Sequence, residues 1–154
     1  MNIIIENRKA YHNYTILEKL EVGIVLYGAE VKSVREKMIS IENAYVQVLN
    51  GELWLIGAHI KHYVNACKFS ELVVNFVRTH TSKEHRDRKL LCHSKELKEL
   101  KYKSEAKGFT IVPLKIYEKH GRFKLEIGMA KGKNTVDKRN TLKEKAIKRD
   151  MLRT

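Results

Sequence analysis

The chain has 154 residues, which suits one folded domain with an extension and is too short for two independent cores. Apolar residues make up 43% of the sequence, as in ordinary globular proteins, so most of the chain is expected to fold. The net charge of +13 excludes a balanced surface and indicates a polyanionic partner, of which nucleic acid is the obvious one.

The first periodic segment alternates apolar and polar residues over positions 14–26. Ile16, Leu20 and Val22 fall on the apolar side, which predicts one long or bent strand pair, with Gly23 as a bulge or bend. Residues 28–38 then change to a helical period, so a helix is expected there.

The clearest local signal is Asn50-Gly51 between two alternating runs. This dipeptide predicts a type I′ hairpin, because both of its residues must adopt positive φ. The alternating apolar positions before and after the turn are Ala44, Val46, Val48, Trp54, Ile56, Ala58 and Ile60.

Residues 75–89 are polar and basic and are expected to form an exposed loop. A short helix should follow, with Ser94 as its N-cap, Leu97 and Leu100 on its buried face, and Gly108 just past its end.

A second hairpin is predicted over residues 109–129, with its turn near His120-Gly121. Pro113 cannot donate to a ladder, so it should lie at an edge or a bulge. About six strands with two or three short helices favour a mainly β fold. We expect an OB-like antiparallel β-barrel with flanking helices over residues 1–130.

The last segment, residues 131–154, contains nine Lys or Arg and three Asp or Glu, a net charge of +6. Thr141 and Glu144 form a capping box that could begin a helix running to about Met151. Its apolar residues scatter around the helix and give no stripe able to dock on the barrel. This basic C-terminal tail is therefore predicted to be disordered when free and helical on an anionic partner.

Catalytic and metal-binding patterns are weak. His59 and His62 lack further ligands at usable spacing, and residues 128–134 resemble a P-loop with one residue too few between the glycines. Cys67 and Cys92 are best read as small buried hydrophobes in a reducing cytoplasm. We expect no enzyme activity, no cofactor and no metal.

The sequence also gives no sign of a membrane protein. The opening MNIII is too short for a signal peptide, and no apolar run approaches the roughly 20 residues of a membrane span. An acidic membrane surface is a weaker partner than nucleic acid, because no basic amphipathic helix carries Trp or Phe on its other face.

Binding features are richer. Arg8 and Lys9 stand among tyrosines able to stack on bases, although those tyrosines could equally be core. Arg86 and Arg88, two apart, would point the same way in an extended segment as a phosphate clamp, unless they lie in a solvated loop. Glu30 would orient a cation such as Arg35, accept bonds from base or sugar donors, or simply complement a helix dipole.

Several motifs together resemble one known family, the SsrA-binding protein (SmpB) family. They are NRKAYHNYTILEKLEVGIVLYGAEVKSVRE, RDRKLL, VPLKIYEKHGRFKLEIGMAKGK and DKR, in order and over nearly the whole chain. The resemblance implies an OB-type barrel that is not an enzyme. It also implies binding of transfer-messenger RNA (tmRNA) and its delivery to stalled ribosomes in trans-translation.

The resemblance further implies a division of labour. The barrel would hold the tRNA-like part of tmRNA as a monomer in a 1:1 complex, through Asn7, Arg8, Lys9, Glu30, Lys32, Arg35, Arg86, Arg88 and Lys89. The tail would enter the decoding centre and the empty mRNA channel of the small-subunit RNA, with matching positions Lys131, Gly132, Lys133, Asp137, Lys138 and Arg139. One position departs from the family: Val136 stands where members often have His or an aromatic residue able to stack.

Two alternatives stay open on charge and periodicity. A ribosomal protein or general translation factor would also combine a small barrel with a cationic extension, and would bind ribosomes without tmRNA. A nuclease or nucleotide-processing enzyme is disfavoured, because no carboxylate or metal cluster is evident.

Overall fold

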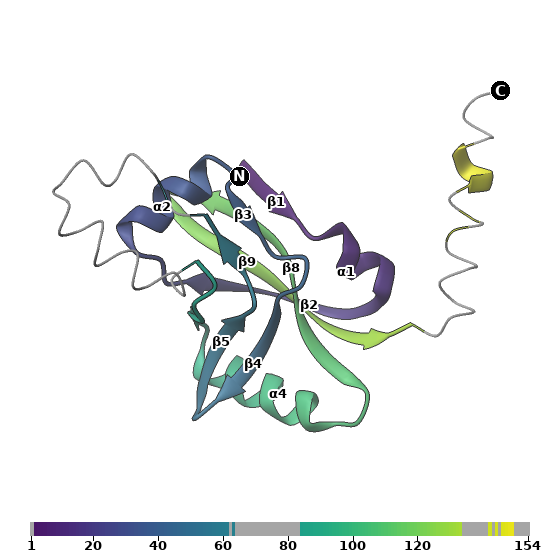
Figure 1. The fold of residues 1–154 in the computed structure, drawn as a ribbon. Coiled ribbons are helices and arrows are strands. Elements are labelled where there is room, and N and C mark those ends of the chain that lie inside the picture. The colour runs from purple at the N-terminus through teal and green to yellow at the C-terminus, as the bar shows by residue number, and fades with distance from the viewer. Residues whose placement is uncertain are drawn as a thin grey trace, which may run out of the picture.

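The computed structural model describes residues 2–61, 63 and 84–133, together with Leu142, Glu144 and residues 146–149. Strands dominate the described residues, and the helices are short (Figure 1). The strands are β1 (Asn2–Glu6), β2 (Tyr14–Ile24), β3 (Ile39–Ser40), β4 (Tyr45–Leu49), β5 (Glu52–Ile56), β6 (His59–Ile60), β7 (Arg88–Leu91), β8 (Phe109–Lys119) and β9 (Arg122–Gly132). The helices are α1 (Arg8–Asn13), α2 (Gly28–Arg35) and α4 (Ser94–Glu105).

The main sheet is antiparallel and its hydrogen bonding returns to its start. The strand order is β1-β8-β4-β5-β7-β2-β9, and β9 pairs back onto β8, so the ladder forms a ring with β1 attached outside it. Strands β3 and β6 form a separate two-stranded sheet. The predicted mainly β, antiparallel fold is confirmed.

Both predicted hairpins are present, the first with the type I′ turn predicted for it and the second with its turn at the predicted position. Asn50 and Gly51 have φ of 51° and 74°, and His120 and Gly121 have φ of 51° and 71°. Left-handed backbone at both central residues is the requirement of a type I′ turn, whose twist matches that of the flanking strands.

The face of β5 differs from the expected one. The two-residue turn sets the register so that Val46 lies opposite Leu55, and therefore Leu53 and Leu55 are buried. Trp54, named by the alternation, faces the other side of the sheet and is only partly buried. Gly57, with φ of 78°, changes the phase again, so that the following Ala58 is buried as expected.

The bulge in β2 lies six residues before the predicted one. The register shifts between Ile16 and Glu18, whereas Gly23 pairs regularly with both neighbouring strands. A Cβ at position 23 would lie 3.2 Å from the Cβ of Leu91, so glycine allows close approach there. The bulge expected at Pro113 is confirmed, since the β8 register shifts just after it.

The core lies inside the ring and is completed by α2 and α4, which contribute Val34 and Leu100. A smaller cluster lies outside it under α1, where Ala10 packs against Val112 and Leu114. The α1 helix was not predicted from the sequence.

The helix expected after residue 93 is present as α4, but its N-cap is His93 and not Ser94. Part of the segment expected to be loop, Arg88 and Lys89, instead begins strand β7. The rest of that segment up to residue 83 lies outside the described residues, as do His62 and Cys67.

In the tail, Leu142, Glu144 and residues 146–149 are helical and exposed, in agreement with the predicted helix at those positions. The capping residue Thr141 and the predicted end at Met151 lie outside the described residues. Every helix within the described residues is too short or too polar to cross a bilayer.

Candidate nucleic-acid interface

The first candidate region is built around Glu30, in the first turn of α2. Its Oε2 accepts a hydrogen bond from the backbone N–H of Tyr27 at 2.9 Å, which satisfies one free donor of the helix start. The interpretation of Glu30 as a first-turn acid is therefore confirmed. The expectation that it orients a cation is also confirmed, but the cations are Arg86 and Arg88 and not Arg35, which was named as the example.

Arg88 is the buried member of this ion cluster, with an exposed fraction of 0%. Its Nε and Nη2 donate to Glu30 Oε1 at 3.1 and 2.9 Å. Its Nη1 donates to the carbonyls of Ala58 and Arg86, both at 2.9 Å. A guanidinium so enclosed has no surface to offer to a phosphate in this conformation, so it holds the loop before β7 against α2 from within.

Arg86 is the outward member of the same cluster. Its Nε donates to Glu30 Oε1 at 2.9 Å, and its Nη2 pairs with Glu30 Oε2. Its guanidinium carbon lies 4.0 Å from the centroid of the Tyr27 ring, a cation–π arrangement. Tyr27 is 61% exposed, so the stacked pair forms part of the molecular surface.

The electrostatics of the cluster favour the ionised carboxylate. Burial on its own would raise the pKa of Glu30. Hydrogen bonds from Arg86 and the Tyr27 N–H, with the charge of Arg88, outweigh it and leave the pKa lowered. The cluster keeps a net positive charge, because one carboxylate faces two guanidinium groups.

The other cations predicted on α2 have their own partners. Arg35 pairs with Glu118 at 3.1 Å and lies 5.7 Å from the Phe123 ring centroid. Lys32 is exposed, and its ammonium lies 5.6 Å from the Tyr63 ring centroid. Both side chains are available at the surface beside the ion cluster.

A hollow next to α2 contains residues that the sequence analysis missed. It is lined by Gly23, Ile24, Leu26, Val31, Arg35, Leu91, Gly121, Arg122, Phe123 and Lys124. Leu91 is 53% exposed and lies among Arg122 and Lys124 from the start of β9. The sequence signal for Arg122 and Lys124 was their i, i+2 spacing directly after the turn at His120-Gly121. Nothing marked Leu91, since apolar residues in strands are usually buried.

The residues predicted near the N-terminus form a second region. Asn7 is 1% exposed and caps α1: its Oδ1 accepts from Ala10 N at 3.0 Å. Its Nδ2 donates to the carbonyls of Ile41 and Pro113, both at 3.0 Å. Asn7 thus supports the fold from inside, while its neighbours Arg8 and Lys9 are exposed on α1.

The two regions lie toward opposite ends of strand β1. Residue Asn2 pairs with Glu118, the partner of Arg35 at the end of α2, whereas α1 follows the other end of β1 (Figure 1). The remaining predicted RNA-binding residue of residues 1–130, Lys89, pairs with Glu52 on the neighbouring strand β5.

The predicted tail residues divide at position 133. Lys131 and Gly132 still pair within β9, opposite Thr15 and Tyr14. Lys133 donates from its backbone N–H to Asn13 O at 3.0 Å and from Nζ to Tyr11 O at 3.1 Å. Asp137, Lys138 and Arg139, like the divergent Val136, lie outside the described residues.

Comparison with known proteins gives a consistent set of similarities. The family model described as "SmpB protein" matches residues 4–154. The SsrA-binding protein of Protochlamydia amoebophila is 45% identical over 148 residues, which cover 96% of this chain and 90% of that protein. The SsrA-binding protein of Staphylococcus aureus (strain JH1) is 43% identical, with 96% and 89% covered.

One solved structure gives the same result in three dimensions. It is described as "tmRNA-SmpB: a journey to the center of the bacterial ribosome" and aligns with a TM-score of 0.64 at 40% sequence identity. The alignment covers 85% of each chain.

Proposed function

The chain belongs to the SmpB family, and on that premise we propose that it binds tmRNA and acts with it on stalled ribosomes in trans-translation. The observation that carries the proposal is the match to relatives named for binding SsrA, the tmRNA, over almost the full length of both proteins. The family is one of non-enzymatic RNA-binding proteins, so no catalytic step is part of the proposal.

The closed ring of strands serves, in this proposal, as an OB-like barrel that presents the RNA-binding surface. The closed hydrogen-bonding order and the short flanking helices support this description. Leu91 provides exposed apolar surface in the hollow that Arg35, Arg122 and Lys124 line with positive charge, and Tyr27 provides an exposed ring against Arg86. Such a combination suits structured RNA, which is contacted through phosphates, sugars and unstacked bases.

We assign two kinds of role to eight of the nine predicted barrel residues, all except Lys89. Arg8, Lys9, Lys32 and Arg35 are exposed and would contact RNA, whereas Asn7 and Arg88 are buried and would hold the surface in shape. Glu30 and Arg86 connect the two groups, since Arg86 is partly exposed and is oriented by Glu30.

The second part of the proposal concerns residues 131–154. Their net charge of +6 and the exposed helical positions after Leu142 support a separate role in the small-subunit decoding centre and the empty mRNA channel. The chain would act as a monomer in a 1:1 complex with tmRNA, in the cytoplasm, where ribosomes translate.

The first test is binding to the tRNA-like domain of tmRNA, with excess elongator tRNA as competitor. We expect binding to survive the competitor. Arg122→Ala with Lys124→Ala should weaken it by at least about tenfold, with a salt dependence shallower by roughly one unit per lost phosphate contact. The matched control, Lys98→Ala with Lys101→Ala on the exposed face of α4, removes the same charge elsewhere and should bind normally.

Binding that the competitor erases would instead favour a general polyanion-binding protein, such as the ribosomal protein considered above. Equal weakening by both double variants would show that overall charge, and not this surface, determines affinity.

The tail is tested by truncation after Lys133, which keeps the bonds of that residue to α1. The truncated protein should bind the tRNA-like domain nearly as well as the full chain and should fail to support tagging in a reconstituted translation assay. Tagging by the truncated protein would refute the proposed role of the tail.

A further inference from the structure

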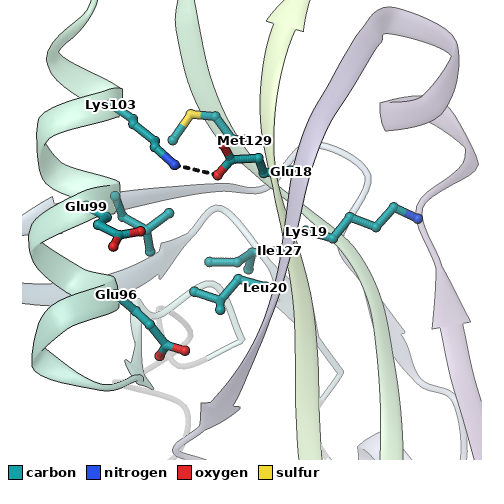
Figure 2. A pocket seen from close by; sticks show the side chains of 9 residues that line it. Glu18, Lys19, Leu20, Glu96, Glu99, Lys103, Ile127 and Met129 are labelled. Carbon is teal, nitrogen blue, oxygen red and sulfur yellow. Dashed lines mark hydrogen bonds and ion pairs between the residues drawn. The ribbon is translucent and has the colours of Figure 1, made fainter.

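A groove between α4 and the strands β2 and β9 is not used by the proposed function. Its floor contains Leu20, Leu100, Ile127 and Met129, and it continues past Leu17, Tyr102, Ala106 and Phe109. In Figure 2 the labelled side chains of α4 point across the groove toward those of β2 and β9.

The rim of the groove is acidic, although the chain as a whole is strongly basic. Four carboxylates line it: Glu18, Glu96, Glu99 and Glu105. Within the part of the chain that the structure describes, two cations line it, and both have partners. Lys103 pairs with Glu18 at 2.6 Å, and Lys19 extends to the other side of β2, where it lies 3.5 Å from Glu126 (Figure 2).

Large apolar side chains are exposed at the same place. Tyr102 is 81% exposed and Leu17 is 54% exposed. Leu17 is the extra residue of the β2 bulge, which turns its side chain out of the regular alternation and toward the groove. Contiguous exposed apolar surface with a charged rim is typical of a protein–protein contact, and the thioether of Met129 adapts to varied partners.

The position of the groove separates it from the proposed RNA surface. The β2–β9 ladder carries Gly23 opposite Lys124 at one end, by the basic hollow, and Glu18 opposite Met129 five residues along, by the groove. These two positions are about 17 Å apart at the usual rise per strand residue. The hollow and the groove have no lining residue in common. Carboxylates at the groove repel phosphate, which excludes RNA as its natural occupant.

We propose that this groove binds a lysine- or arginine-rich segment of a second protein, which places an apolar side chain against Leu17, Tyr102 and Met129. The acidic rim selects the cationic segment and steers its approach, and the apolar floor supplies the anchor. The proposal assigns the protein a protein-binding surface in addition to its RNA-binding surface.

The test uses the full chain and a fluorescently labelled synthetic peptide with leucines on one face and lysines on the other. Fluorescence anisotropy should show saturable binding. A peptide with the lysines replaced by glutamates should bind at least about tenfold more weakly. Leu17→Ser with Tyr102→Ser should weaken binding of the lysine peptide by at least about tenfold, because both anchor contacts are lost.

A control is Tyr45→Ser with Leu49→Ser, which alters another exposed tyrosine and another exposed leucine outside the groove. Glu99→Lys should weaken peptide binding, whereas Glu42→Lys, an equal charge change at another exposed site, should not. All variants should keep the binding of the wild-type chain to the tRNA-like domain, so this proposal can fail while the RNA-binding function stands.

Three results would overturn the proposal: no saturable binding, equal binding of the two peptides, or equal weakening by the groove variant and its control. Tighter peptide binding after truncation at Lys133 would also overturn it, since the chain's own tail would then be the occupant.

Discussion

The starts of α1 and α2 solve one structural problem in two ways. At α1, the neutral amide of Asn7 caps the helix and donates to the carbonyls of Ile41 and Pro113. At α2, the carboxylate of Glu30 accepts from the Tyr27 N–H and binds two guanidinium groups. Both side chains therefore fasten a helix start to segments that are distant in sequence.

The two helix starts differ in which groups remain unpaired when the capping side chain is removed. Without Asn7, two carbonyls and one N–H lose their partners, but no charge is uncovered. Without Glu30, the guanidinium of Arg88, which is 0% exposed, keeps its charge in the interior. Removing one member of a buried ion pair therefore costs more stability than removing a buried amide, even where the two interactions give a similar net stabilisation.

The largest expected effect is that of Glu30→Ala. Leaving the buried Arg88 charge unpaired should lower the free energy of unfolding by about 3–5 kcal/mol. Urea denaturation measures it, with Glu42→Ala at an exposed position as the control, which should change stability by less than about 0.5 kcal/mol. A loss below about 1 kcal/mol for Glu30→Ala would remove the distinction between the two helix starts.

Asn7→Ala should have the next largest effect, about 2 kcal/mol, from the lost cap and the lost bonds to two buried carbonyls. Asn7→Ser separates these contributions, because serine keeps a capping oxygen but cannot reach both carbonyls. We expect serine to recover about 1 kcal/mol of the loss. Equal stability of the two variants would show that the cap contributes nothing.

The acid sensitivity of the α2 cluster gives a third comparison. Because the folded-state pKa of Glu30 lies below its ordinary value of 4.5, the unfolded chain binds a proton there first as the pH falls. The stabilisation is present above about pH 4.5 and is lost as the pH falls toward the folded-state value.

The measurement is the free energy of unfolding between about pH 3 and pH 6. The wild-type chain should lose stability with falling pH more steeply than Glu30→Gln, which lacks the titrating group. The Glu42→Gln variant should follow the wild-type slope. Identical slopes for wild type and Glu30→Gln would contradict the assignment.

The smallest effect is expected for the ion pair of Lys103 and Glu18, whose side chains are 38% and 61% exposed. A double-mutant cycle with Lys103→Met and Glu18→Gln should give a coupling energy close to zero, because water screens the exposed pair. A coupling as large as the loss in Glu30→Ala would show that burial does not account for the contrast.

The sequence predicted features that local chemistry determines. The two type I′ turns follow from residue types that tolerate positive φ, and the long strands follow from alternation. The inward face of β5 was predicted wrongly because its residues are apolar on both faces, so only the register set by the turn distinguishes Leu53 from Trp54. Helix α1 was missed because its residues 8–13 carry no apolar stripe, and its start depends on Asn7 reaching carbonyls far along the chain.

The sequence predicted which residues form the candidate site but not how deeply each of them is buried. Arg86 and Arg88 share a carboxylate, as two side chains pointing the same way can, but the sequence could not show that one is buried and the other stacked on Tyr27. Burial here depends on the approach of α2 and of the carbonyl of Ala58, which are distant in sequence. The same is true of Leu91, whose strand neighbour Gly23 is distant in sequence.

In the proposed division of labour between residues 1–130 and the tail, strand β9 connects the two parts. It begins with Arg122 in the basic hollow and ends at Gly132, directly before Lys133 is fastened to α1. A strand of this length spans at most about 33 Å, and its pairing with both β2 and β8 stiffens it. In that proposal, β9 therefore sets the distance between RNA held at the basic hollow and the start of the tail.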